Sequence, residues 1–298
     1  MSITPTVAND EVFSLGEGPL WDAPRRRILW VDILAKTVMI GTLDGLAIRV
    51  IERHAFDGLV GAVTIADDGS LLVAVQEQLV VVHPGGRHET GPRIIPTGDE
   101  RRLNDGCTDP AGRFIIGTLS LGAPSERETL VQVHHDASVV ELDNDLTLSN
   151  GLAWSADGTL LYSVDTLRST IFVRPYDVAT GRIGERRVHL VLDDGYPDGI
   201  ALDTDHHLWV AVWGAGEVRR FNPEGVQVDS IAVPAPHTSS VAFAGDDLRT
   251  LVITTAATQL DAQQLAAHPD SGRLFTARVT TPGLPVAPWA GFGHPSPH

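Results

Sequence analysis

The residues best placed to do chemistry in this chain of 298 residues are polar side chains that recur at a regular interval. Six corresponding positions follow one another about 45 residues apart. These positions are Glu17, Val60, Asn104, Asn150, Asp198 and Ser239. Aspartate and asparagine often occupy turns, which explains any one of them as the start of a strand. Glu17 fits that explanation poorly, because glutamate is not a favoured turn residue and here it lies between two glycines.

Glu17 and Asp198 would repel each other and lose hydration if the fold brought them together. A bound cation would remove both costs. Carboxylate and amide oxygens suit a hard divalent ion such as Ca²⁺, Mg²⁺ or Mn²⁺. We therefore expect one metal held by Glu17, Asn150 and Asp198, with Asn104 on the rim of the site. Three protein ligands leave positions for water and substrate, as a catalytic metal requires.

The elements that would carry these residues have the character of short β-strands. Apolar, β-branched runs such as RILWVDI, SLLVAV, RFIIGTL and HLWVAV alternate with turns rich in Gly, Asp, Asn and Pro. Long stretches with helical periodicity are missing from the sequence. Dense turn signals with so few helix signals predict an all-β protein.

The strands recur as six units, which begin near residues 17, 60, 104, 150, 198 and 239. Several strands in a repeat of this length are typical of a β-propeller, in which each repeat forms one four-stranded blade. We expect a single six-bladed β-propeller domain over residues 1–298, with a central metal site. The segment from Val7 to Phe13 would add the outer strand of the last blade and close the ring. Residues 290–298 are expected to form a loose tail.

The composition excludes several classes of function. Acidic residues outnumber basic ones, 38 against 22, and the net charge of −16 argues against nucleic acid and anionic membranes as partners. The single cysteine, Cys107, excludes an internal disulfide framework and fits a reducing compartment. No signal peptide or membrane-spanning run is recognisable. We expect a cytoplasmic protein, a monomer or small homo-oligomer, whose partner is a small molecule.

The chain also resembles a known family in the stretches GEGPLWD, RLNDGCTDPAGRFIIGT, SNGLAWSADGTLLYSVDT and PDGIALD. These stretches are similar to the signatures of the regucalcin/gluconolactonase family, also called the senescence marker protein family. The late stretch DLRTLVITTA followed by GRLF matches too, so the resemblance runs from Glu17 to Phe275 in order and spacing. It implies a six-bladed propeller with one divalent metal in the central channel, bound by Glu17, Asn150 and Asp198.

The resemblance further implies hydrolysis of a sugar lactone, such as glucono-, xylono- or arabinonolactone, to the aldonic acid. The metal, which could be Ca²⁺, Zn²⁺, Mg²⁺ or Mn²⁺, would act as Lewis acid and Asp198 as general base. The substrate-contacting arginine and asparagine of the family fall on Arg102 and Asn104. One departure is the stretch GTLSLGAPSERET, where Ser120 and Leu121 stand where some relatives carry an acidic residue. The choice of lactone therefore stays open.

Two other functions would use the same features. A metal-dependent esterase or organophosphate-type hydrolase would need the same metal site, and a non-enzymatic calcium-binding propeller would need only the ligands. A deep polar pocket over the metal would favour an enzyme, whereas a flat apolar patch on that face would favour a scaffold. The pairs His134–His135 and His206–His207 lie in apparent turns, and we expect them to be solvated rather than metal ligands.

Overall fold

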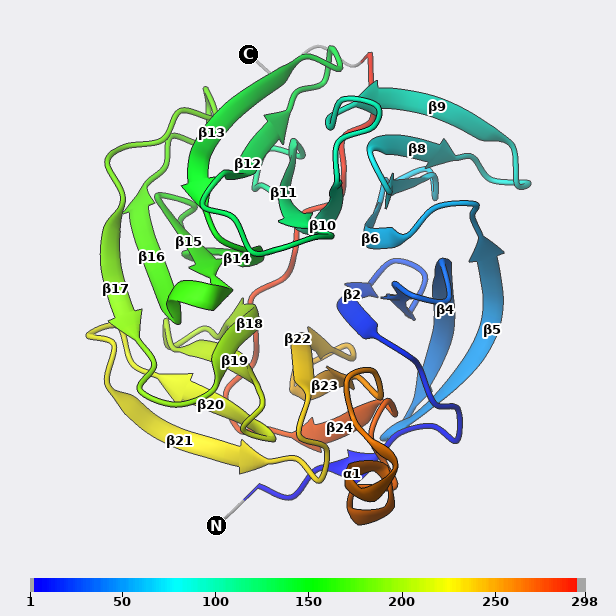
Figure 1. Ribbon diagram of the computed structural model, residues 1–298, viewed down its shortest axis with the longest axis vertical. Helices are drawn as coiled ribbons and strands as arrows, with labels where there is room; N and C mark the ends of the chain where they lie inside the picture. The colour runs from blue at the N-terminus through cyan, green and yellow to red at the C-terminus, as the bar shows by residue number, and fades with distance from the viewer. Residues whose placement is uncertain (1–2, 294–298) are drawn as a thin grey trace.

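Six four-stranded antiparallel sheets form a ring, as Figure 1 shows for the computed structural model, which describes residues 3–293. Each sheet is one blade of a propeller, so the predicted all-β, six-bladed fold is confirmed. In the first five blades the strands follow chain order from the centre outward. The turns between inner strands place glycine where φ is positive, as at Gly112 and Gly158, which a residue without a side chain adopts without strain.

The first three blades are built from residues 16–146. Blade 1 contains β2 (Gly16–Asp22), β3 (Arg27–Asp32), β4 (Thr37–Asp44) and β5 (Ala47–Ala55). Blade 2 contains β6 (Val60–Ile65), β7 (Leu71–Val75), β8 (Gln78–Val82) and β9 (His88–Arg93). Blade 3 contains β10 (Arg101–Thr108), β11 (Phe114–Ser120), β12 (Glu128–Val133) and β13 (Val139–Leu146).

The other three blades continue the same pattern. Blade 4 contains β14 (Ser149–Trp154), β15 (Leu160–Asp165), β16 (Thr170–Pro175) and β17 (Arg187–Val191). Blade 5 contains β18 (Tyr196–Leu202), β19 (Leu208–Trp213), β20 (Glu217–Phe221) and β21 (Gln227–Ala232). Blade 6 contains β22 (Thr238–Ala244), β23 (Thr250–Thr255), β24 (Phe275–Arg278) and, on its outer edge, β1 (Thr6–Val7).

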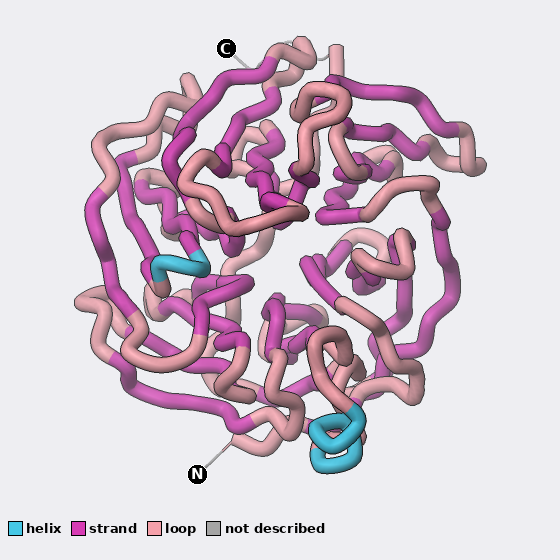
Figure 2. Tube along the Cα trace, in the orientation of Figure 1, coloured by secondary structure: helices cyan, strands magenta, loops and turns pink. Residues whose placement is uncertain are grey.

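Within residues 3–293, helical structure is confined to two short elements, the 3₁₀ turn η1 (Thr166–Arg168) and the helix α1 (Ala262–Ala267), both cyan in Figure 2. A capping box explains why α1 begins where it does, since the Asp261 side chain accepts the backbone N–H of Gln264 and the Gln264 side chain accepts that of Asp261. Among the described residues, no helix is both long and apolar enough to cross a membrane.

The ring is closed by pairing the N-terminal strand with the last blade. β1 pairs antiparallel with β24, with Thr6 opposite Thr276 and Val7 opposite Phe275. The expectation that the N-terminal segment supplies the outer strand of blade 6 is therefore confirmed, although the strand covers Thr6–Val7 rather than extending to Phe13. Closure of this kind joins residues distant in sequence and leaves no open edge between the first and last blades.

The innermost strand of every blade lines the central channel and carries an irregularity at a corresponding place. The register of β2 shifts between Glu17 and Leu20, that of β14 between Asn150 and Leu152, and β6, β10, β18 and β22 each show a shift at the same level. A bulge adds one residue to one strand and re-aims the neighbouring side chains. The six positions predicted from the repeat therefore lie at or beside these bulges.

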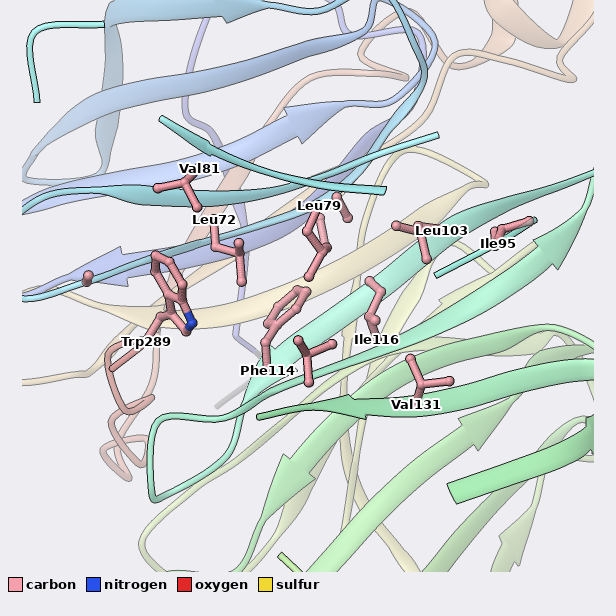
Figure 3. Close-up of a cluster of buried hydrophobic side chains, with 13 residues drawn as sticks. Leu72, Leu79, Val81, Ile95, Leu103, Phe114, Ile116, Val131 and Trp289 are labelled. Atoms are coloured by element: carbon pink, nitrogen blue, oxygen red, sulfur yellow. The ribbon is translucent and has the colours of Figure 1, made fainter. Parts of the chain in front are cut away.

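The apolar core lies between adjacent blades. Figure 3 shows one such cluster, in which Leu72 and Leu79 of blade 2 face Phe114 and Ile116 of blade 3. Trp289, from the C-terminal segment, completes this cluster and is only 4% exposed. Because the inner strands are apolar on both faces, each blade buries one face against the preceding blade and the other against the following blade.

The C-terminal segment runs across the far end of the channel rather than ending at blade 6, as the red trace in Figure 1 shows. The Leu284 N–H donates to Leu202 O at 2.9 Å, and the Trp289 N–H donates to Ile65 O at 2.9 Å. The expected loose tail, residues 290–298, is held in place at its start, because Ala290 N–H donates to Gly112 O and Gly293 N–H to His135 O. Residues 294–298 lie outside the described residues.

The position of Trp289 predicts that it stabilises the whole ring. We expect Trp289→Ala to lower the free energy of unfolding by about 3–5 kcal/mol, because it leaves a cavity between blades 2 and 3. Val188→Ala, on the outer strand β17 where the side chain is 55% exposed, serves as control and should change it by less than about 0.5 kcal/mol. Urea unfolding measures both, and equal effects of the two variants would contradict this account of the core.

Candidate metal centre

The polar residues predicted from the repeat gather at one end of the central channel. Glu17, Asn104, Asn150 and Asp198 begin or nearly begin their strands, and each is 5–7% exposed. The other two positions offer no free ligand oxygen. Val60 is fully buried and apolar, and the Ser239 hydroxyl donates to Gly16 O at 2.6 Å. We call this end of the channel, with Glu17, Asn104, Asn150 and Asp198, the hub. The oxygens that it offers to a metal therefore come from carboxylates and amides.

A chain of hydrogen bonds connects the polar residues of blades 3, 4 and 5. Arg102 Nη1 donates to Asn104 Oδ1 at 2.7 Å, and Asn104 Nδ2 donates to Asn150 Oδ1 at 2.9 Å. Asn150 Nδ2 in turn donates to Thr166 Oγ1 at 2.9 Å, whose hydroxyl donates to Pro197 O at 2.8 Å. The chain fixes the orientation of both amides, and a second lone pair of Asn150 Oδ1 stays available to a ligand.

The two carboxylates at the hub, Glu17 and Asp198, have few hydrogen-bond partners. Asp198 Oδ1 is buried and, among the described residues, has no hydrogen-bond partner. The Glu17 carboxylate accepts the N–H of its own neighbour Gly18 at 3.0 Å. Buried polar oxygens in native proteins almost always have partners, so an unpartnered one needs an explanation. A cation at the hub would supply it.

The electrostatics of the hub point the same way. Burial, and then the negative charge of Asp105, raise the pKa of Glu17 to about 8, against the opposing effects of the Gly18 N–H and Arg102. Burial, and then the charges of Glu17 and Asp105, raise the pKa of Asp198 well above its ordinary value. Burial also lowers the pKa of Arg102 to about 10, although Glu17 and Asp198 oppose this. One guanidinium cannot neutralise three carboxylates, and a divalent cation would balance the remainder.

Asp105 is the member of this group that sequence reasoning missed. It lies beside Asn104 in the bulge of β10, and burial raises its pKa to about 6. The glycine that follows each repeated position could have identified Asp105 from the sequence. Aligning Asp105–Gly106 with Asn150–Gly151 and Asp198–Gly199 places Asp105, rather than Asn104, at the repeated position. The repeat therefore brings a third carboxylate to the hub.

Below the hub the channel widens into a chamber of about 630 Å³. Its walls are mostly apolar, and the segment Leu284–Pro288 crosses its outer end. Asp105 and Cys107 line it, and burial raises the pKa of the Cys107 thiol to about 12. The thiol therefore stays protonated near neutral pH and is no nucleophile.

A second group of ligand-type side chains lies after β18, at the opposite end of blade 5 from Asp198. The ligand atoms of Asp203, Asp205 and His207 lie within 4.8 Å of one another. The Asp203 carboxylate already accepts the Trp209 indole N–H at 2.9 Å and the Arg220 Nε–H at 2.8 Å. Arg220 balances the charge of Asp203, and hydrogen bonds are donated to the Asp203 carboxylate. This cluster therefore does not need an ion.

Comparison with known proteins shows the family and agrees with the fold. A family model described as the SMP-30/Gluconolactonase/LRE-like region matches residues 15–257. Regucalcin of Danio rerio is 33% identical over 279 residues, which cover 92% of this chain and 93% of the relative. The 6-deoxy-6-sulfogluconolactonase of Pseudomonas putida is 33% identical over 284 residues, which cover 93% and 95%.

The same likeness holds at the level of structure. A calcium-binding protein, regucalcin, from Agrobacterium tumefaciens matches with a TM-score of 0.90 and 27% identity, and the match covers 97% of this chain and 98% of that chain.

The raised pKa of Glu17 predicts how the metal-free protein responds to pH. Between its ordinary value of 4.5 and about 8, the folded state holds a proton that the unfolded state has released, so the free energy of unfolding falls as pH rises. Glu17→Gln removes the contribution of Glu17 to this dependence, while Asp105 and Asp198 keep theirs. At about pH 8 the metal-free variant should exceed the wild type in stability by about 1 kcal/mol or more. Urea unfolding with a chelator across this range measures it, and a variant no more stable than wild type would contradict the prediction.

Proposed function

Because the chain belongs to the SMP-30/gluconolactonase/LRE-like family, we propose that it hydrolyses a sugar lactone to the aldonic acid, using a divalent metal at the hub. The observation that carries this proposal is the buried Asp198 Oδ1, which has no partner among the described residues. Lactone hydrolysis is supported by relatives that are named as lactonases. A small uncharged cyclic ester also suits a protein whose net charge is −16.

Glu17, Asn150 and Asp198 are the residues that would hold the metal. Their donors are oxygens, which favours the hard ions Ca²⁺, Mg²⁺ and Mn²⁺, while Zn²⁺ also accepts carboxylate ligands. When bound, the ion would polarise the lactone carbonyl as a Lewis acid and stabilise the negative charge that develops on its oxygen. Asp105 would add a further negative charge from below without being needed as a ligand.

Asp198 is the residue that we assign to proton transfer. A carboxylate has two oxygens, so one can bind a cation while the other accepts the proton of the attacking water. Burial and the charges of Glu17 and Asp105 raise its pKa in the metal-free chain, and a bound cation would displace that proton and leave the carboxylate free to accept one from water. The hydroxide adds to the carbonyl carbon, the bond to the ring oxygen breaks, and Asp198 returns the proton to that oxygen. The products are a carboxylic acid and a free hydroxyl.

Arg102 and Asn104 would orient the substrate. Arg102 Nη1 donates to Leu103 O and to Asn104 Oδ1, which fixes the guanidinium and leaves its other N–H groups for substrate hydroxyls. Orientation of this kind lowers the entropy cost of the reaction. Neither Ser120 nor Leu121, at the end of β11, can replace a carboxylate contact, so glucono-, xylono- and arabinonolactone all remain substrates to test.

A calcium-binding role without catalysis is the second candidate. It is favoured by one observation, the match to a solved structure described as a calcium-binding protein. Both functions need the same ligands, but only catalysis needs a proton acceptor next to the metal. Asp198 and the oriented Arg102–Asn104 pair therefore support the enzyme.

Metal removal tests the proposal directly. Acid release from gluconolactone, xylonolactone and arabinonolactone should fall to the uncatalysed rate in chelated protein and return when Ca²⁺, Mg²⁺, Mn²⁺ or Zn²⁺ is added back singly. Asp198→Asn should lose at least about a thousandfold in kcat, because it removes both a ligand and the base. Simple phenyl esters and a phosphotriester belong in the same panel, since the esterase alternative predicts that they are the better substrates.

The control is Asp246→Asn, which removes an exposed carboxylate paired with Arg26 and should leave kcat unchanged. Circular dichroism and thermal unfolding show whether Asp198→Asn keeps the fold. Full activity in chelated protein, or in folded Asp198→Asn, would contradict the proposed chemistry. Tight calcium binding without turnover of any ester would instead support the non-enzymatic role.

A further inference from the structure

Three aromatic residues lie on neighbouring strands where blades 5 and 6 meet at the hub. Tyr196 begins β18, two residues before Asp198, and its register partner is Trp213, the last residue of β19. Trp213 forms a bridge with His237, which immediately precedes β22. The rings of Trp213 and His237 are stacked, with 4.1 Å between centroids and 9° between planes. We call these three residues the aromatic ledge.

Hydrogen bonds to neighbouring backbone groups fix part of the ledge. His237 Nδ1 donates to Thr258 O at 3.0 Å, which fixes the imidazole plane, and the Gly214 N–H donates to Pro236 O at 2.9 Å. Burial lowers the pKa of His237, so near neutral pH the stacked ring carries no charge. Tyr196 differs from these two residues, because 45% of its surface is exposed and no aromatic ring among residues 3–293 pairs with it.

Two further apolar side chains are exposed on the same end of the propeller. Leu167, in η1, is 41% exposed, and its neighbour Thr166 donates to Pro197 O, beside Tyr196. Figure 2 shows this short cyan turn close to the inner strands. Leu121, which follows β11, is 49% exposed. Its loop is tied to η1, because Arg168 Nη2 lies 3.6 Å from Glu126 Oε1.

The chemistry of this rim differs from that of the hub. A lactone that bears only hydroxyl groups would leave Tyr196, Leu167 and Leu121 facing water, which gives no benefit to binding. An apolar or aromatic substituent would cover them and gain affinity from the area removed from water, while Tyr196 and Trp213 would also stack on a ring. The polar side of the same substrate would meet Arg102 and Asn104 of blade 3, which lies across the hub from the aromatic ledge and also carries Leu121.

We propose that the aromatic ledge, with Leu167 and Leu121, is a specificity subsite, and that the natural substrate is a lactone carrying an apolar or aromatic substituent outside its ring. This inference rests on the proposed lactone hydrolysis and deepens it. The subsite touches the substituent and not the reacting bond. It therefore lowers KM for substituted lactones and leaves the hydrolytic step itself to the hub.

The test compares D-gluconolactone with the derivative that carries a benzyl ether on its hydroxymethyl group. The two lactones differ only in this apolar group. In the metal-loaded protein, kcat/KM should be about tenfold higher for the benzyl ether. Tyr196→Ser and Leu167→Ser, both at exposed positions that should tolerate the change, should raise KM for the benzyl ether about fivefold and leave both constants for D-gluconolactone unchanged. Val188→Ser, which changes a 55% exposed valine on the outer strand β17, is the control and should change the constants for neither lactone.

The outcomes separate the two proposals. Hydrolysis of D-gluconolactone with no preference for the benzyl ether overturns the subsite and leaves the proposed function standing. A preference that survives in Tyr196→Ser and Leu167→Ser also overturns it, because another surface would then bind the substituent. Hydrolysis of neither lactone overturns the proposed function, and the subsite falls with it.

Discussion

The convergence of three carboxylates on one channel, two of them buried and one half-buried, is the constraint around which the structure is organised. Glu17, Asp105 and Asp198 come from blades 1, 3 and 5, and Arg102 is the cation that balances part of their charge. Such a group is unfavourable in a folded protein unless protons or a cation neutralise it. In the metal-free chain, protons do so, as the raised pKa of Glu17 shows. A divalent ion would do so without protons and would leave the carboxylates free to act in chemistry.

The closed ring of blades holds these carboxylates in place. The residues that bring their charges to the hub are separated by dozens of positions in the chain. Pairing of β1 with β24, together with the contact of Ser239 with Gly16, closes the ring and keeps the six inner strands around one axis. The bulges at the hub end of those strands turn the side chains toward the channel. The apolar surfaces between blades, with Trp289 among them, supply the burial that offsets the electrostatic cost.

Much of the fold could be predicted because the repeat is visible in the sequence. Glu17, Asn150 and Asp198 recur at matching positions, and the strand-and-turn pattern between them permits few architectures other than a propeller. Asp105 was missed because Asn104 beside it is equally polar, and only alignment on the glycines distinguishes them. The path of residues 283–293 across the channel was also missed, since Pro-rich segments without periodicity carry no local signal of where they pack. The aromatic ledge could not be predicted either, because Trp213 and His237 meet only through the contact between blades 5 and 6.

The central claim is that the hub holds one divalent cation in exchange for protons. Isothermal titration of the chelator-treated protein, in buffers with different enthalpies of ionisation at about pH 7, measures both quantities. Because the pKa of Glu17 is about 8 in the metal-free protein, the account predicts one ion bound per chain with a net release of protons, and loss of this binding in Asp198→Asn. Binding of no ion, or binding whose heat is the same in every buffer and survives in Asp198→Asn, would contradict it.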